Sequence, residues 1–141
     1  MKQKDNVIFL DFDGVLNKKL DDFSESAANP EAVFYVNKLC LENDFKIVVC
    51  SSWRHRDNYE QILHDIGIDK KIGVLGKTKN NPNGREAEIK DFLEDHDIAK
   101  YLIIDDAYLS DDIEDHHVQP ASRLGFTKNK YVEALKKISK L

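Results

Sequence analysis

The sequence predicts an α/β fold, a Rossmann-like three-layer sandwich around a mainly parallel central sheet. Short, almost uninterrupted apolar runs alternate along the chain with segments of helical periodicity. Strands covered on both faces have such apolar runs, and strands that alternate with helices form parallel sheets with right-handed crossovers. Ligands of these folds bind beyond the carboxyl ends of the strands, so functional residues should directly follow the strands.

The predicted elements follow one another in order. Strands are expected at residues 7–10, 46–50 and 101–104, with a weaker candidate at 72–75. A helix is expected from about residue 30 to 43, because Asn29 can cap it and Pro30 suits its first position. A second helix is expected over about 57–66 and is ended by Gly67. A third and a fourth are expected from 85 to about 96 and from 127 to the C-terminus.

Length and composition are those of one ordinary globular domain. The 141 residues are 41% hydrophobic and 33% charged, so we expect a single domain over residues 1–141. Residues 18–28 are too few for a cap domain, and residues 53–84 contain the pattern of one helix, one strand and a loop. We therefore expect no large cap and an open site.

Charge and cysteine content indicate the setting of the protein. A net charge of −5 argues against non-specific nucleic-acid binding, although it leaves room for a local basic patch. The apolar run after the polar N-terminus is too short for a signal sequence or a membrane span. Cys40 and Cys50 have apolar neighbours, so we expect buried thiols in a reducing, cytoplasmic protein. No pattern indicates the oligomeric state.

Two acids separated by one residue, Asp11 and Asp13, follow the first predicted strand. In an extended backbone both side chains point the same way and Phe12 points into the core, while Gly14 allows a sharp turn. Two convergent carboxylates repel each other unless a cation or a shared proton compensates. The pattern therefore suits a divalent metal held by oxygen ligands.

The other strands lead polar residues to the same edge of the sheet. The strand at 46–50 is followed by Ser51, Ser52, Trp53 and Arg54, and the strand at 101–104 by Asp105 and Asp106. Carboxylate and hydroxyl oxygens are what Mg²⁺ and a phosphoryl group require. A cation must offset the phosphate charge, and either Arg85 or Lys90, near the start of a predicted helix, could reach the site.

These motifs resemble the four motifs of the haloacid dehalogenase superfamily. They are Asp-Phe-Asp-Gly-Val-Leu-Asn at 11–17, Ser-Ser-Trp-Arg at 51–54, Arg85-x-x-Glu88-Ile89, and Tyr-Leu-Ile-Ile-Asp-Asp at 101–106. The resemblance covers residues 7–106, and its first motif is specific. With Val-Gln at 118–119 and Leu-Gly-Phe-Thr at 124–127, the set is similar to a small bacterial and viral group that includes phosphatase domains associated with RNA-repair proteins.

The resemblance implies a magnesium-dependent phosphohydrolase. Asp11 would be the nucleophile that forms an aspartyl-phosphate, and Asp13 would be the general acid and base. Ser51 would bind a phosphoryl oxygen. Mg²⁺ would be held by Asp11, the backbone carbonyl of Asp13 and one of Asp105 or Asp106.

Two assignments keep alternatives at this stage. The third motif usually contains Lys; Arg85 is the aligned residue here, and Lys90 follows a turn and a half later. Ser51 is favoured over Ser52 because it directly follows the apolar strand. An open site would admit a phosphorylated polynucleotide end or a protein as well as a small nucleotide, with Ser52, Trp53, Arg54 and Lys90 as substrate contacts.

The rival hypothesis is a binding or signalling domain without catalysis. A receiver-like phosphoacceptor has a similar sheet and acidic site, but its acceptor Asp follows a middle strand, whereas here Ser51 does. An inactive hydrolase-like domain is the other form of this hypothesis. The presence of both Asp11 and Asp13 favours the enzyme.

Overall fold

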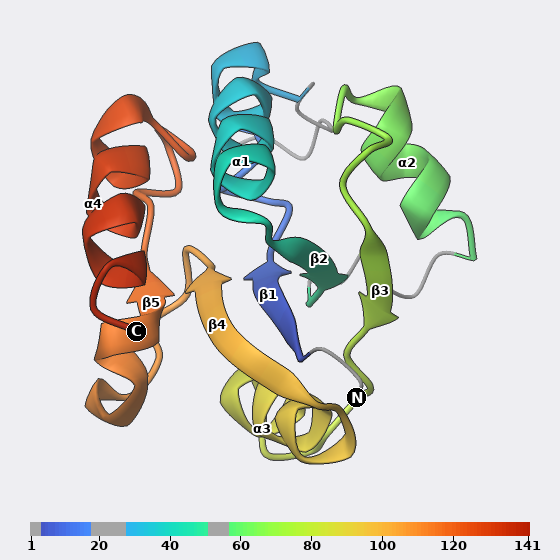
Figure 1. Cartoon of the computed structure of the whole chain (residues 1–141), viewed down its shortest axis with the longest axis vertical. Coiled ribbons are helices and arrows are strands. Elements are labelled where there is room, and N and C mark those ends of the chain that lie inside the picture. The colour runs from blue at the N-terminus through green and yellow to red at the C-terminus, as the bar shows by residue number, and fades with distance from the viewer. Residues whose placement is uncertain (1–3, 18–27, 51–56) are drawn as a thin grey trace.

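A computed structural model describes residues 4–17, 28–50 and 57–141 of the chain. Its sheet has five strands in the order β3-β2-β1-β4-β5 (Figure 1). Every neighbouring pair of strands is parallel. Their bounds are β1 Asp5–Leu10, β2 Lys46–Val49, β3 Val74–Lys77, β4 Ile98–Ile104 and β5 His117–Val118. The prediction of an α/β fold with a parallel sheet is therefore confirmed.

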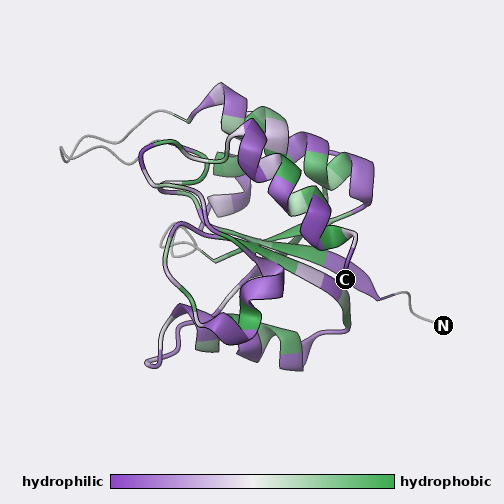
Figure 2. Cartoon of the chain, turned by 90° about the vertical axis from the view of Figure 1, so that its left-hand side faces the viewer, coloured by the Kyte–Doolittle hydropathy of each residue, from purple (hydrophilic) through white to green (hydrophobic). Residues whose placement is uncertain are grey.

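Helices cover both faces of the sheet and complete three layers (Figure 2). One face packs against α1, Pro30–Asn43, α2, Tyr59–Asp65, and α4, Lys128–Ile138. The other face packs against α3, Arg85–Asp95, and the short 3₁₀ helix η2, Asp111–His116. Residues 57–84 form α2, β3 and their turns within this sandwich, so they build no cap.

The start of α1 follows the predicted capping. The Asn29 side chain accepts a hydrogen bond of 3.0 Å from the backbone N–H of Glu31, and Pro30 occupies the first turn. This bond satisfies one of the amides that a helix N-terminus leaves without an intrahelical partner. Asp44, at φ 58°, ends the helix in a left-handed conformation.

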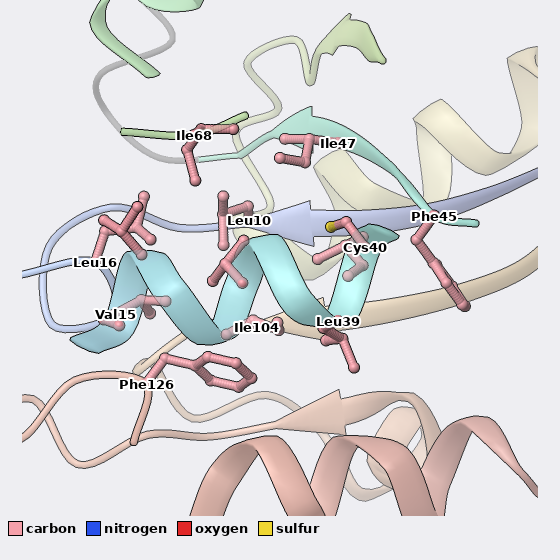
Figure 3. Packing of buried hydrophobic residues seen from close by; sticks show 14 of the residues in the cluster. Leu10, Val15, Leu16, Leu39, Cys40, Phe45, Ile47, Ile68, Ile104 and Phe126 are labelled. Carbon is pink, nitrogen blue, oxygen red and sulfur yellow. The ribbon is translucent and has the colours of Figure 1, made fainter. Parts of the chain in front are cut away.

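Alternating strand residues divide the core into two clusters. Ile8 and Leu10 of β1 face α1 and α4, while Val7 and Phe9 face α3. Figure 3 shows Leu10 and Ile104 of the sheet close to α1, with Phe126 on the α4 side. Each such side chain stabilises the fold by about 1.5–3 kcal/mol when it leaves water. Burial on both faces explains why the strands read as continuous apolar runs.

Several predicted boundaries were wrong. Strand β3 begins two residues later than predicted, because Ile72 is buried in a turn and donates its N–H to Asp69. Strand β4 begins at Ile98, three residues earlier than predicted. Strand β5 was missed, since its two residues give no periodic signal and it pairs only with the end of β4.

Cys40 and Cys50 are free and buried, as predicted, and they belong to opposite core clusters. Burial raises the pKa of the Cys40 thiol to about 12, so this thiol stays protonated and unreactive. No helix within the described part of the chain is long and apolar enough to cross a membrane.

Candidate active site

Strand register brings the ends of β1, β2 and β4 level with one another. Leu10 of β1 pairs with Val49 on one side and with Ile104 on the other. The ladder then continues for one residue, because Cys50 donates its N–H to Leu10 and Asp11 donates its N–H to Ile104, both at 3.0 Å. Residues that follow these strands are therefore neighbours at the carboxyl edge of the sheet.

Three carboxylates meet at this edge. Asp11, Asp105 and Asp106 each contribute a carboxylate oxygen, and these atoms lie within 4.8 Å of one another. Asp11 is 6% exposed and Asp105 is fully buried. Burial, the charge of Asp105 and a hydrogen bond with Asp106 raise the pKa of Asp11 to about 8, although the positive charge of Arg85 opposes this shift. Such a cluster needs a cation before all of its members can ionise together.

Arg85 supplies part of the positive charge. Its Nη1 lies 3.6 Å from Oδ1 of Asp11 and also pairs with Oδ2 of Asp105. Arg85 is the first residue of α3 and directly follows Gly84. Gly84 has a φ of 100°, a conformation that glycine adopts without strain. Buried Glu88 holds the preceding loop by accepting the N–H of Asn81 at 3.1 Å. The guanidinium therefore reaches the cluster from a fixed helix start.

Lys90, the other predicted cation, has a different partner. Its Nζ lies 3.1 Å from Glu86 of the preceding turn, and its side chain is 53% exposed. The structure thus brings Arg85 to the acids, while Lys90 pairs with a surface carboxylate.

The turn after β1 contains Asp13, whose carboxylate is held by Asn17. Asp13 Oδ1 accepts a hydrogen bond of 3.1 Å from the side-chain amide of Asn17, and Asn17 in turn accepts the N–H of Gly14 at 2.9 Å. Gly14 has a φ of 79°, and a Cβ at this position would collide with the carboxylate of Asp106. The sharp turn predicted at Gly14 is confirmed, and only glycine fits it.

The three carboxylates could hold a metal ion. Carboxylate oxygens are hard ligands, and their number and spacing suit a hard divalent cation such as Mg²⁺. Asp13 is close along the chain but contributes no side-chain oxygen to this group of three. Its backbone carbonyl remains the atom through which it was predicted to bind metal.

Residues 7–131 match the family model described as the HAD domain in Swiss Army Knife RNA repair proteins. The chain belongs to this family. No curated protein and no solved structure matched it. Membership in the HAD superfamily, predicted from the motifs, is thereby confirmed, and the family indicates a phosphohydrolase-type role.

Four residues of the predicted site of this HAD domain follow strand β2 in the sequence. Ser51, Ser52, Trp53 and Arg54 lie outside the described residues. Strand β2, which precedes these residues in the sequence, ends at the same carboxyl edge of the sheet as β1, the strand before Asp11. This agrees with the order of the motifs in the sequence. The roles assigned to these four residues stay predictions.

Two polar residues near the acids of the HAD domain were not predicted. Asn17 is buried and contacts Asp13, and Ser122 donates a hydrogen bond of 2.7 Å to Asp106. Asn17 closes the first motif, so its position in that motif was an available signal. Ser122 lies between the two segments at 118–119 and 124–127, and no pattern in the sequence distinguishes it from other loop serines.

Proposed function

We propose that this HAD domain is a magnesium-dependent phosphatase that hydrolyses phosphate monoesters through an aspartyl-phosphate on Asp11. The convergence of Asp11, Asp105, Asp106 and Arg85 at one sheet edge carries this proposal. A nucleophilic carboxylate, a cation for the phosphoryl oxygens and a set of hard oxygen ligands are the parts that phosphoryl transfer to an aspartate needs.

The first step forms the covalent intermediate. A carboxylate oxygen of Asp11 attacks phosphorus, the bond from phosphorus to the ester oxygen breaks, and Asp13 gives its proton to that leaving oxygen. Arg85 would donate hydrogen bonds to the phosphoryl oxygens, and its planar guanidinium suits two of them at once. The resemblance assigns Ser51 a further hydrogen bond to the same group.

The second step releases phosphate. Asp13, now ionised, takes a proton from a water molecule whose oxygen attacks phosphorus, and the bond from phosphorus to Asp11 breaks. The contact with Asn17 supports this role, because the amide keeps the Asp13 carboxylate in one orientation through both steps. This step restores the carboxylate of Asp11 and releases inorganic phosphate.

The buried carboxylates support a metal requirement. Asp11, the backbone carbonyl of Asp13 and one of Asp105 or Asp106 would hold Mg²⁺. When bound, Mg²⁺ supplies positive charge that offsets the carboxylates and the phosphoryl oxygens. The raised pKa of Asp11 supports this requirement, because a buried nucleophile that binds a proton near neutral pH needs compensation to stay ionised.

We further propose a phosphorylated polynucleotide end as the substrate. The family occurs in RNA repair proteins, which favours a nucleic-acid phosphate over a small metabolite. Ser52, Trp53 and Arg54 would contact the nucleotide next to the phosphate, with Lys90 further out along α3. The two free cysteines support the reducing, cytoplasmic setting that we propose.

The test is turnover of an aryl phosphate with Mg²⁺ and with EDTA. Wild type, Asp11→Asn and Asp112→Asn are compared, since Asp112 is an exposed acid on η2 and serves as the matched control. We expect activity that needs the metal, falls at least about 10³-fold in Asp11→Asn and is retained in Asp112→Asn. A folded wild type without turnover under any divalent metal would support the binding-module hypothesis instead.

A second comparison tests the substrate. Oligonucleotides with a 3′ or a 5′ phosphate are compared with mononucleotides under the same conditions. The proposal expects a higher kcat/KM for one class of oligonucleotide end. A preference for mononucleotides would contradict the assigned substrate while leaving the phosphatase activity intact.

A further inference from the structure

The loop between β5 and α4, residues 119–127, lies against the turn that carries the first motif. Phe126 donates its N–H to the carbonyl of Val15 at 2.8 Å, and its ring is fully buried. Gly125 has a φ of 72°, and a Cβ there would lie 2.9 Å from the same carbonyl oxygen. The loop therefore has a defined position next to the turn.

From this position the loop holds Asp106 at two points. Ser122 donates its hydroxyl to Oδ2 of Asp106 at 2.7 Å, and the side-chain amide of Gln119 donates to the backbone carbonyl of Asp106 at 3.1 Å. A short hydrogen bond to one carboxylate oxygen limits the orientations that the side chain can adopt. The Ser122 bond therefore restricts the orientation of the carboxylate, while the Gln119 bond restricts its backbone.

Asp105 is oriented by different means. Its Oδ2 pairs with Arg85, and its Oδ1 accepts the N–H of Ala107 at 2.9 Å. Both carboxylate oxygens of Asp105 therefore have a partner, and neither partner belongs to the loop at 119–127. Asp106 is more exposed and takes its side-chain donor from a loop that is distant in sequence.

We propose that Ser122 is a positioning residue for the metal, because it orients Asp106 toward Asp11. The inference rests on the proposed function, since it names a residue that serves the same metal site. One hydroxyl on Oδ2 leaves the carboxylate with further lone pairs for a cation. Partners that orient metal ligands in this way typically contribute about 10- to 100-fold to metal affinity or activity.

The experiment measures Mn²⁺ binding to the full chain by electron paramagnetic resonance, without substrate. Wild type is compared with Ser122→Ala and with the pair Ser122→Thr and Ser122→Val, which have nearly the same shape and differ in the hydroxyl. Ser139→Ala is the matched control, because the Ser139 hydroxyl donates a hydrogen bond to the backbone carbonyl of Lys136 at the end of α4. Thermal unfolding in EDTA verifies that each variant is folded.

We expect the Mn²⁺ dissociation constant to rise about tenfold in Ser122→Ala and Ser122→Val. Ser122→Thr should retain most of the affinity for Mn²⁺, and Ser139→Ala should bind Mn²⁺ as wild type does. Equal affinity in Ser122→Thr and Ser122→Val overturns the role of the hydroxyl, as does a wild type that binds no Mn²⁺. A wild type that binds Mn²⁺ but hydrolyses no phosphate ester contradicts the proposed function alone, because the hydroxyl effect on binding would still be measured.

Discussion

Asp11→Asn should stabilise the metal-free protein at alkaline pH, although it removes the proposed nucleophile. The Asp11 carboxyl is buried beside Asp105 and Asp106, and its pKa rises from an ordinary value of 3.8 to about 8. The folded state therefore holds a proton that the unfolded chain has already released. Asn has nearly the same shape as a protonated Asp and never ionises, so the variant avoids the free-energy cost of a buried charge at this position.

The sign and size of the effect follow from this difference in pKa. Between about pH 4 and about pH 8 the folded state binds more protons at Asp11 than the unfolded state, so wild-type stability falls as the pH rises. At about 1.4 kcal/mol per pKa unit, the rise in pKa from 3.8 to about 8 sets an upper limit of roughly 6 kcal/mol. Relaxation and water entry reduce such penalties, and we expect about 2 kcal/mol above pH ~8.

Urea unfolding in EDTA across this pH range measures the effect. The two proteins should have similar midpoints near pH ~4, and Asp11→Asn should have the higher midpoint, by about 1 M urea, above pH ~8. Asp112→Asn, at an exposed position, should follow wild type throughout. Parallel curves for wild type and Asp11→Asn would mean that Asp11 ionises as easily in the folded state as in the unfolded chain, which contradicts a raised pKa.

Three further predictions concern the site and the core. Gly14→Ala should destabilise the protein by at least about 1–2 kcal/mol and weaken metal binding, because φ is 79° and the new Cβ collides with Asp106. Urea unfolding measures the first effect and Mn²⁺ titration the second. Unchanged stability and affinity would contradict this prediction. Arg85→Ala should lower kcat/KM by about 10²- to 10³-fold and Arg85→Lys by less, whereas equal losses would show that positive charge alone is insufficient. Phe126→Ala should cost about 3–5 kcal/mol in urea unfolding, and a loss below about 1 kcal/mol would mean that the loop before α4 is not anchored there.

The main elements could be predicted because local signals determine them. The Asn29-Pro30 pair marks the start of α1, and the apolar run before Asp11 marks a strand buried on both faces. Strand β5 could not be found in this way, since it exists only through pairing with the end of β4. Ile72 misled the strand prediction because a buried residue in a turn resembles the start of an apolar strand.

The site could be predicted to the extent that its residues directly follow strands. Asp11 and the Asp105-Asp106 pair come together because parallel strands end at one edge, which motif order already implies. The choice between Arg85 and Lys90 depended on where α3 begins and which way each side chain extends. The Ser122 contact depends on a loop brought close by the whole fold, so no local pattern could have predicted it.

Trapping the phosphorylated protein shows whether Asp11 is the nucleophile. Asp13→Asn is mixed with an aryl phosphate and Mg²⁺, quenched in acid and analysed by intact mass and peptide mapping. The good leaving group lessens the need for a general acid, while the loss of the base slows hydrolysis of the intermediate. We expect one phosphoryl group on Asp11, absent from the Asp11→Asn/Asp13→Asn double variant. A phosphoryl group on another residue, or an Asp13→Asn protein that stays unmodified at every quench time although the wild type turns over the same ester, would contradict it.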